Sequence, residues 1–63
     1  MMGNMILKLI SVFGELITID TDCIVSLTLW HDEWTKIEWF KNGELTTKIV
    51  RESPQEIFKL VEN

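Results

Sequence analysis

The sequence predicts a small α+β domain in which an antiparallel meander sheet of four or five strands is followed by one short C-terminal helix. Short runs of apolar and β-branched residues, bounded by turn-forming residues, recur as far as residue 50. Asn42-Gly43 separates two of these runs and is a strong hairpin signal, because both residues tolerate positive φ. Ser53-Pro54-Gln55-Glu56 then opens a segment with one apolar face, which is typical of a capped helix start.

Three strands are expected in the first half of the chain. Residues 5–13 are apolar at nearly every position, which is typical of a strand covered on both faces. Gly14-Glu15 forms a turn before a second strand at residues 16–19. A second turn follows at residues 20–22, because Asp and Thr side chains bond to nearby backbone groups. The third strand, residues 23–30, alternates, with Cys23, Val25, Leu27 and Leu29 on one face and Ile24, Ser26, Thr28 and Trp30 on the other.

A polar loop at residues 31–34 leads into a final hairpin of residues 35–40 and 45–50, whose register is open. A two-residue loop would pair Phe40 with Leu45 and Trp39 with Thr46, whereas a three-residue loop would pair Trp39 with Leu45. We favour the three-residue loop because it separates apolar from charged side chains. It would place Ile37, Trp39, Leu45 and Ile49 on one face and Lys36, Glu38 and Lys48 on the other.

The helix is the element with the most specific signals. Ser53 can cap the first turn, Pro54 suits the first helical position, and Glu56 can reach back to complete a capping box. Its apolar stripe consists of Ile57, Leu60 and Val61, with Phe58 beside it. A helix of about nine residues is too short to persist alone, so we expect it to dock on the sheet.

The length of 63 residues indicates one domain, residues 5–63, after a flexible lead at residues 1–4, in which the start is ambiguous among Met1, Met2 and Met5. Domains this small usually need a disulfide, a metal or oligomerisation for stability. Cys23 is the only cysteine and His31 the only histidine, which excludes an internal disulfide and a Cys/His zinc site. Assembly remains, and we therefore expect a homo-oligomer or an obligate partner chain.

The charge and the motifs argue against several functional classes. The net charge of −4 and the scattered basic residues disfavour nucleic acid as a partner. Residues 5–13 include Lys8 and are too short to span a bilayer, so we expect a cytoplasmic protein without membrane association. The three glycines are isolated, so the sequence has no glycine-rich phosphate-binding loop. We interpret His31-Asp32-Glu33 as a solvated loop and Cys23 as a buried structural thiol. We expect no catalytic residue, no cofactor and no metal, and hence no enzyme.

The strands carry more apolar surface than one short helix can cover. We therefore expect the second sheet face, or an edge strand, to contact another chain. Trp30, Trp34 and Trp39 cluster within ten residues, and Trp is common both in cores and at binding hot spots. The candidate interface or ligand surface comprises Leu27, Leu29, Trp30, Trp34, Ile37 and Trp39.

The leading hypothesis is a non-catalytic interaction module, a homo-oligomer that binds another protein through an apolar sheet face. One alternative is a ligand-binding or sequestering protein in which Trp30 and Trp34 line an aromatic pocket between subunits. A second alternative is an acidic inhibitor of the phage type, which is suggested by the small size and the negative charge.

Several short segments resemble the FlbD family, small proteins of flagellar and motility loci with a run of strands and a C-terminal helix. They are Met5-Ile6, Gly14, residues 19–24, Asn42-Gly43 and residues 50–57. The chain departs from that family at residues 11–14, where the family has a more polar turn ending in Asn-Gly, and at residues 30–39, which are longer and more aromatic. The resemblance implies the same fold class and a role as a motility-related regulator.

Overall fold

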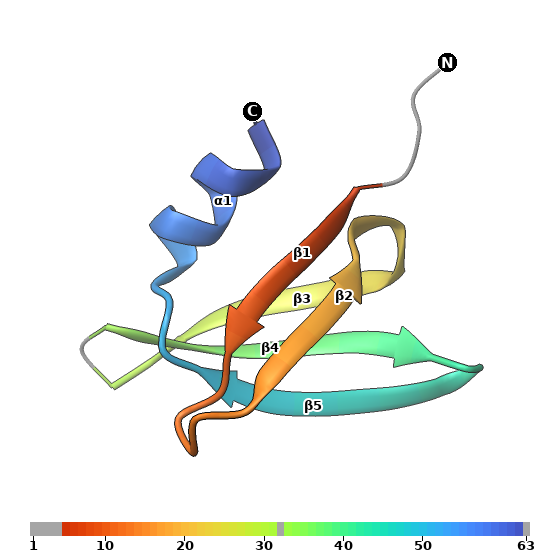
Figure 1. Cartoon of the computed structure of the whole chain (residues 1–63), viewed down its shortest axis with the longest axis horizontal. Coiled ribbons are helices and arrows are strands. Elements are labelled where there is room, and N and C mark those ends of the chain that lie inside the picture. Colours follow the sequence, from red (N-terminus) through yellow and green to blue (C-terminus); the bar gives the residue numbers. More distant parts are fainter. Residues whose placement is uncertain (1–4, 32, 63) are drawn as a thin grey trace.

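A computed structural model of the chain describes residues 5–31 and 33–62 (Figure 1). The expected lead at residues 1–4 lies outside the described residues, as do Asp32 of the expected polar loop and Asn63. The elements in chain order are β1 (Ile6–Ile10), β2 (Leu16–Asp20), a 3-10 turn η1 (Thr21–Cys23), β3 (Ile24–Trp30), β4 (Trp34–Lys41), β5 (Glu44–Val50) and α1 (Pro54–Glu62). The predicted α+β class, with five antiparallel strands and one short C-terminal helix, is confirmed.

The five strands divide into two sheets, where the sequence suggested one meander. β1 pairs with β2, and β3, β4 and β5 form a three-stranded sheet in that order. The β1–β2 hairpin crosses over one side of the larger sheet (Figure 1). The two sheets meet at one corner, where the Val12 amide donates to the Ile49 carbonyl at 3.1 Å and the Arg51 amide donates to the Ile10 carbonyl at 2.8 Å. The end of β1 is therefore fastened to the end of β5.

The hydrophobic core lies between the two sheets. Alternate residues of the strands point into it, as the pleat of a strand requires. Its buried members are Leu7, Leu9, Ile17, Ile19, Ile37, Trp39, Val50 and Ile57. The expectation that the first strand is covered on both faces is wrong. Ile6 and Lys8 are exposed because no other described element lies over the outer side of the β1–β2 hairpin.

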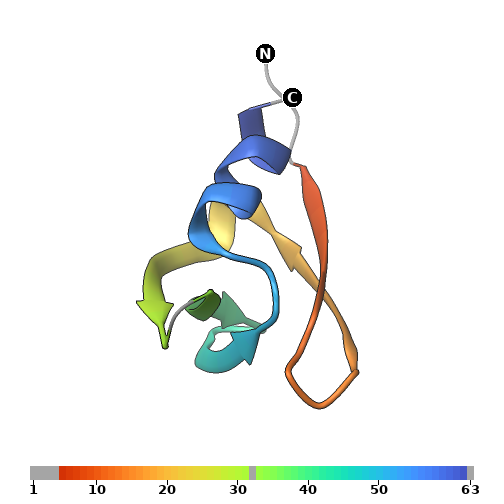
Figure 2. The same cartoon turned by 90° about the vertical axis from the view of Figure 1, so that its left-hand side faces the viewer.

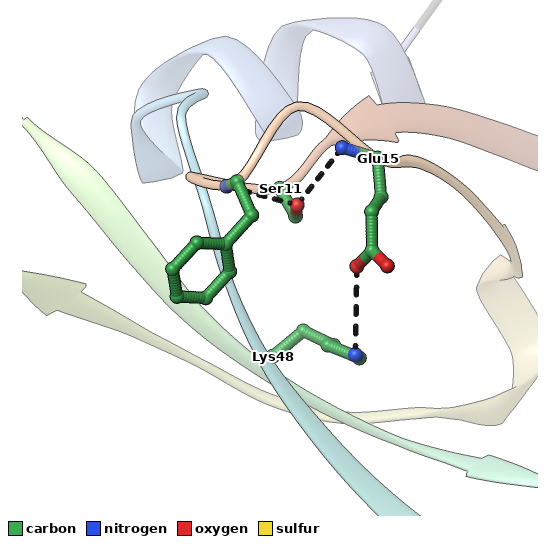
Figure 3. Close-up of polar contacts among 4 residues, drawn as sticks. Ser11, Glu15 and Lys48 are labelled. Atoms are coloured by element: carbon green, nitrogen blue, oxygen red, sulfur yellow. Dashed lines mark hydrogen bonds and ion pairs between the residues drawn. The ribbon is translucent and has the colours of Figure 1, made fainter.

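The turn between β1 and β2 is organised by one buried hydroxyl (Figure 3). Ser11 is 2% exposed, and its Oγ accepts hydrogen bonds from the Phe13 and Glu15 amides, each at 3.1 Å. Gly14 takes a φ of 90°, which suits a residue without a side chain. The Glu15 carboxylate lies 3.7 Å from the Lys48 ammonium on β5. The turn thus joins the smaller sheet to the larger one.

The favoured three-residue loop of the β4–β5 hairpin is wrong, and the two-residue alternative is present. Phe40 pairs with Leu45 and Trp39 with Thr46. Asn42 and Gly43 have φ values of 54° and 82°, as both central residues of a type I′ turn require. This register places Lys48 opposite Ile37 on the inner face. The lysine is tolerated there because it lies at the open margin of the core, with its side chain 47% exposed and paired with Glu15.

The expected alternation along the third strand is wrong at its start. Ile24 pairs with Trp39 and Ser26 with Glu38, so Val25 forms a bulge between them. Ile24 therefore turns towards the core, and Val25 is 52% exposed.

The predicted capping box of α1 is confirmed. The Glu56 amide donates to Ser53 Oγ at 3.1 Å, and the Ser53 amide donates to Glu56 Oε1 at 2.8 Å. The apolar stripe docks chiefly through Ile57, which is fully buried, whereas Leu60 and Val61 are 44% and 40% exposed. The helix lies at one end of the two-sheet arrangement (Figure 2).

The segment between β5 and α1 is held by two buried or partly buried polar contacts. The Glu52 carboxylate accepts from the Ile10 amide, with both oxygens at 3.1 Å. Thr35, fully buried on β4, donates its hydroxyl to the Glu52 carbonyl at 2.7 Å. These bonds connect β1, β4 and the start of the helix around one residue.

Candidate functional site

The side of the three-stranded sheet that faces away from the β1–β2 hairpin is the strongest candidate for a functional surface. We call it the outer face and define it by the strand register, which places its side chains in four rows across the sheet. In order along β4, these rows are Trp30–Trp34, Thr28–Lys36–Ile49, Ser26–Glu38–Thr47 and Phe40–Leu45.

The two end rows of the outer face are apolar and accessible. Trp30 and Trp34 are each 40% exposed, Phe40 is 49% exposed and Leu45 is 54% exposed. None of the described elements lies over this side of the sheet (Figures 1 and 2). Several large apolar side chains on one uncovered sheet face are the usual mark of a contact with another molecule.

An aromatic cluster occupies the end of the face at the β3–β4 connection. The His31 ring meets Trp30 edge-on, with centroids 5.7 Å apart, and meets Trp34 edge-on at 6.0 Å. His31 has a φ of 58°, so the chain reverses there and brings the two tryptophans opposite each other. The Lys36 ammonium lies 5.8 Å from the Trp30 ring centroid, which is within cation–π range. A cation and three aromatic rings therefore gather at one end of the outer face.

Two opposite charges occupy adjacent rows at the centre of the face. Lys36 and Glu38 both project from β4, and each is half-buried. The Glu38 carboxylate accepts a short hydrogen bond from Ser26 Oγ at 2.6 Å and a longer one from Thr47 Oγ1 at 3.5 Å. These hydroxyls come from the strands on either side, so they fix the carboxylate over the middle of the sheet.

The six residues of the sequence-predicted surface separate into three groups. Trp30 and Trp34 lie on the outer face and are accessible. Leu29 is 56% exposed at the margin of the inner face, and Leu27 is partly buried against the core. Ile37 and Trp39 are 0% and 4% exposed in the chain's own core, so they contribute no free surface.

Sequence reasoning misses the opposite end of the outer face. It does not include Phe40 in the candidate surface, and it places Leu45 on the same face as Ile37. The sequence does contain a signal for this end of the face, because a two-residue Asn42-Gly43 loop sets Phe40 opposite Leu45. The same register puts both residues on the opposite side of the sheet from Trp39.

Two hollows lie away from the outer face. A cleft of about 300 Å³ lies between the start of β2 and the tip of the β4–β5 hairpin, and its charged lining includes Glu15, Lys41 and Lys48. A shallow, largely apolar hollow of about 400 Å³ is lined by Leu29 and the start of α1. Both are open to solvent, and the cleft is spanned by the Glu15–Lys48 ion pair.

Three further features of the described residues concern metal ligands, the free thiol and membrane-spanning helices. Within residues 5–31 and 33–62, no three or more His, Cys, Asp and Glu side chains come together as a metal site. The Cys23 thiol is free and half-buried beside the core. No helix in the described part of the chain has the length and apolar character needed to cross a bilayer.

Comparisons of the chain with protein-family models, curated proteins and solved structures found no match. The resemblance to the FlbD family therefore stays a prediction.

Proposed function

We propose that this chain is a non-catalytic interaction module that self-associates and binds another protein through the outer face of its three-stranded sheet. One observation carries the proposal: Trp30, Trp34, Phe40 and Leu45 project from a sheet face that no described part of the chain covers. Tryptophan and phenylalanine supply large contact areas at small cost in side-chain entropy, which is why they are frequent in binding surfaces.

The size of the face limits the area that a partner can bury. β4 has eight residues, so the face is about 26 Å long and about 14 Å wide at the usual strand dimensions. Such a face is smaller than the roughly 800 Å² that each partner contributes to a standard stable interface. We therefore expect dissociation constants in the micromolar range rather than an obligate assembly.

Sedimentation equilibrium across the micromolar range tests the proposal. The wild-type chain is expected to form a concentration-dependent dimer, and Trp34→Ser is expected to shift it towards the monomer. Leu16→Ser is the matched control, because Leu16 is 63% exposed on the outer side of β2, away from the proposed contact. A wild-type chain that is monomeric throughout, or equal effects of the two substitutions, would contradict the proposal.

A second candidate function is the binding of a small aromatic ligand at the Trp30–His31–Trp34 cluster. The edge-on rings and the neighbouring Lys36 ammonium support it, since exposed aromatic rings can stack on planar ligands. Tryptophan fluorescence titrated with a panel of nucleotides and aromatic metabolites tests this candidate. A saturable change that Trp30→Ala abolishes supports it, whereas a spectrum unchanged across the panel contradicts it.

A further inference from the structure

The pattern of charge on the outer face is specific enough to indicate how a second copy would dock. Along β4, the outer side chains follow the order Trp34, Lys36, Glu38, Phe40. The order is apolar, positive, negative, apolar. We infer that two copies pair face to face with their β4 strands antiparallel, about a two-fold axis that passes over Ile37. This inference rests on the proposed function, because it assumes that the outer face is the contact.

The antiparallel arrangement matches both the charged and the apolar positions. A two-fold axis in the plane of the interface and perpendicular to β4 reverses the strand direction in the second copy. Lys36 then lies over Glu38 of the second copy, and by symmetry the same pair forms twice. Trp34 lies over Phe40 of the second copy, also twice. Every outer residue of β4 therefore meets a complementary one.

The alternative arrangement with parallel β4 strands is disfavoured by the same charges. An axis parallel to β4 would set Lys36 over Lys36 and Glu38 over Glu38. Like charges that face each other across a partly dehydrated interface are costly, which is a common means of excluding wrong registers. The two charges thus select one arrangement of the four rows.

The structure gives the apolar rows and the charged rows different roles. The Trp and Phe side chains provide the area whose burial drives association. Lys36 and Glu38 add little net affinity, because the loss of water from both ions offsets much of their attraction. Glu38 is already held by Ser26 and Thr47, so little further ordering is needed when a lysine approaches. The charged rows therefore set the register.

Charge reversal, followed by sedimentation equilibrium on the full chain, tests the register. Lys36→Glu makes two carboxylates face each other at both charged contacts of the dimer, and Glu38→Lys makes two ammonium groups face each other there. Each variant alone is expected to raise the dimer dissociation constant about tenfold or more, since each dimer then contains two like-charge contacts. An equimolar mixture of the two variants forms mixed dimers in which one of the two contacts pairs the introduced carboxylate of one copy with the introduced ammonium of the other. The other contact pairs the original Glu38 with the original Lys36, so both contacts join opposite charges again.

The double variant Lys36→Glu/Glu38→Lys restores both opposite-charge contacts within one chain. The mixture and the double variant are both expected to return to within about threefold of the wild-type affinity. Rescue by mixing also controls for folding, because a misfolded variant would not recover affinity when combined with another. Trp34→Ser is measured in parallel as the test of the face itself.

The outcomes separate the register from the proposed face. If the single reversals leave the dissociation constant unchanged while Trp34→Ser raises it, the antiparallel register is overturned and the proposed face stands. Single reversals that weaken the dimer without rescue in the mixture also overturn the register. A wild-type monomer at all concentrations overturns both the register and the proposed function.

Discussion

Alanine substitutions at Ile57 and Leu60 should differ sharply in their effect on the free energy of unfolding. Ile57 is the only large apolar side chain of the described helix that is fully buried, and it belongs to the core between the two sheets. Leu60 lies on the same stripe but is 44% exposed. We expect Ile57→Ala to destabilise the fold strongly and Leu60→Ala to have little effect. Alanine is the best helix former, so neither change weakens the helix itself.

The magnitudes follow from burial. Truncating a fully buried isoleucine costs about 2–5 kcal/mol, through lost burial and the cavity left behind. A domain of 63 residues is expected to have a total unfolding free energy of roughly 3–9 kcal/mol. Ile57→Ala would therefore remove a large part of the stability. Leu60→Ala should cost roughly 1 kcal/mol or less, because much of that side chain already contacts water.

Urea unfolding followed by tryptophan fluorescence measures this difference, with the protein kept below the concentration at which it dimerises. With a slope near 1 kcal/mol per molar urea for a domain of this size, Ile57→Ala should lower the midpoint by about 2 M or more. Leu60→Ala should lower it by about 1 M or less. Equal shifts in the two variants would refute the account of how the helix docks.

The remaining predictions concern the turns and the segment between β5 and α1. Gly43→Ala should lower the unfolding free energy by about 1–2 kcal/mol, because its φ of 82° disfavours a residue with a Cβ. No atom crowds the added Cβ, so no clash adds to this cost, and unchanged stability in urea would contradict the left-handed conformation of Gly43. Ser11→Ala should lower the unfolding free energy by about 1–3 kcal/mol, because two amides lose their acceptor at a buried position. Hydrogen exchange at the Phe13 and Glu15 amides should accelerate, and unaltered protection would count against this role of Ser11. Glu52→Ala should lower the unfolding free energy by about 1.5–3 kcal/mol, because the Ile10 amide loses a charged acceptor. The Ile10 amide resonance should move in the NMR spectrum of the variant, and an unchanged resonance would contradict that hydrogen bond.

Local signals in the sequence predict the parts of the fold that depend on local contacts. The Ser53–Glu56 capping box and the Gly14 turn involve residues within four positions of each other, so their chemistry is visible in the chain itself. The 3-10 turn after β2 is of the same kind, with the Asp22 amide donating to the Asp20 carboxylate at 3.0 Å.

The register errors arise from contacts between distant segments. The local pattern favours a three-residue loop because that loop keeps Lys48 off the apolar face. The chain instead accepts Lys48 there, because Glu15 from another hairpin meets it at the edge of the core. Nothing in the local pattern around Val25 signals its bulge, which depends on how β3 must bend to pair with β4.

The candidate surface is only partly predictable, because it too depends on contacts between distant segments of the chain. The alternation of a strand divides its residues into two faces but does not say which face receives the second sheet. Trp30 and Trp34 belong to the predicted surface and are exposed, whereas Ile37 and Trp39 also belong to it and lie in the core. Their burial depends on the β1–β2 hairpin crossing the inner face, an arrangement set by contacts between the corner residues of β1 and β5.

The central claim is that the outer face of the three-stranded sheet is the contact surface, and a concentration series of amide NMR spectra tests it most directly. As the protein concentration passes through the micromolar range, the account predicts that resonances of the outer-face residues of β4 move together. Those of Lys8 and Thr18, on the outer side of the β1–β2 hairpin, should stay fixed. Shifts confined to the β1–β2 hairpin or to the exposed end of α1, or spectra that do not depend on concentration, would contradict it.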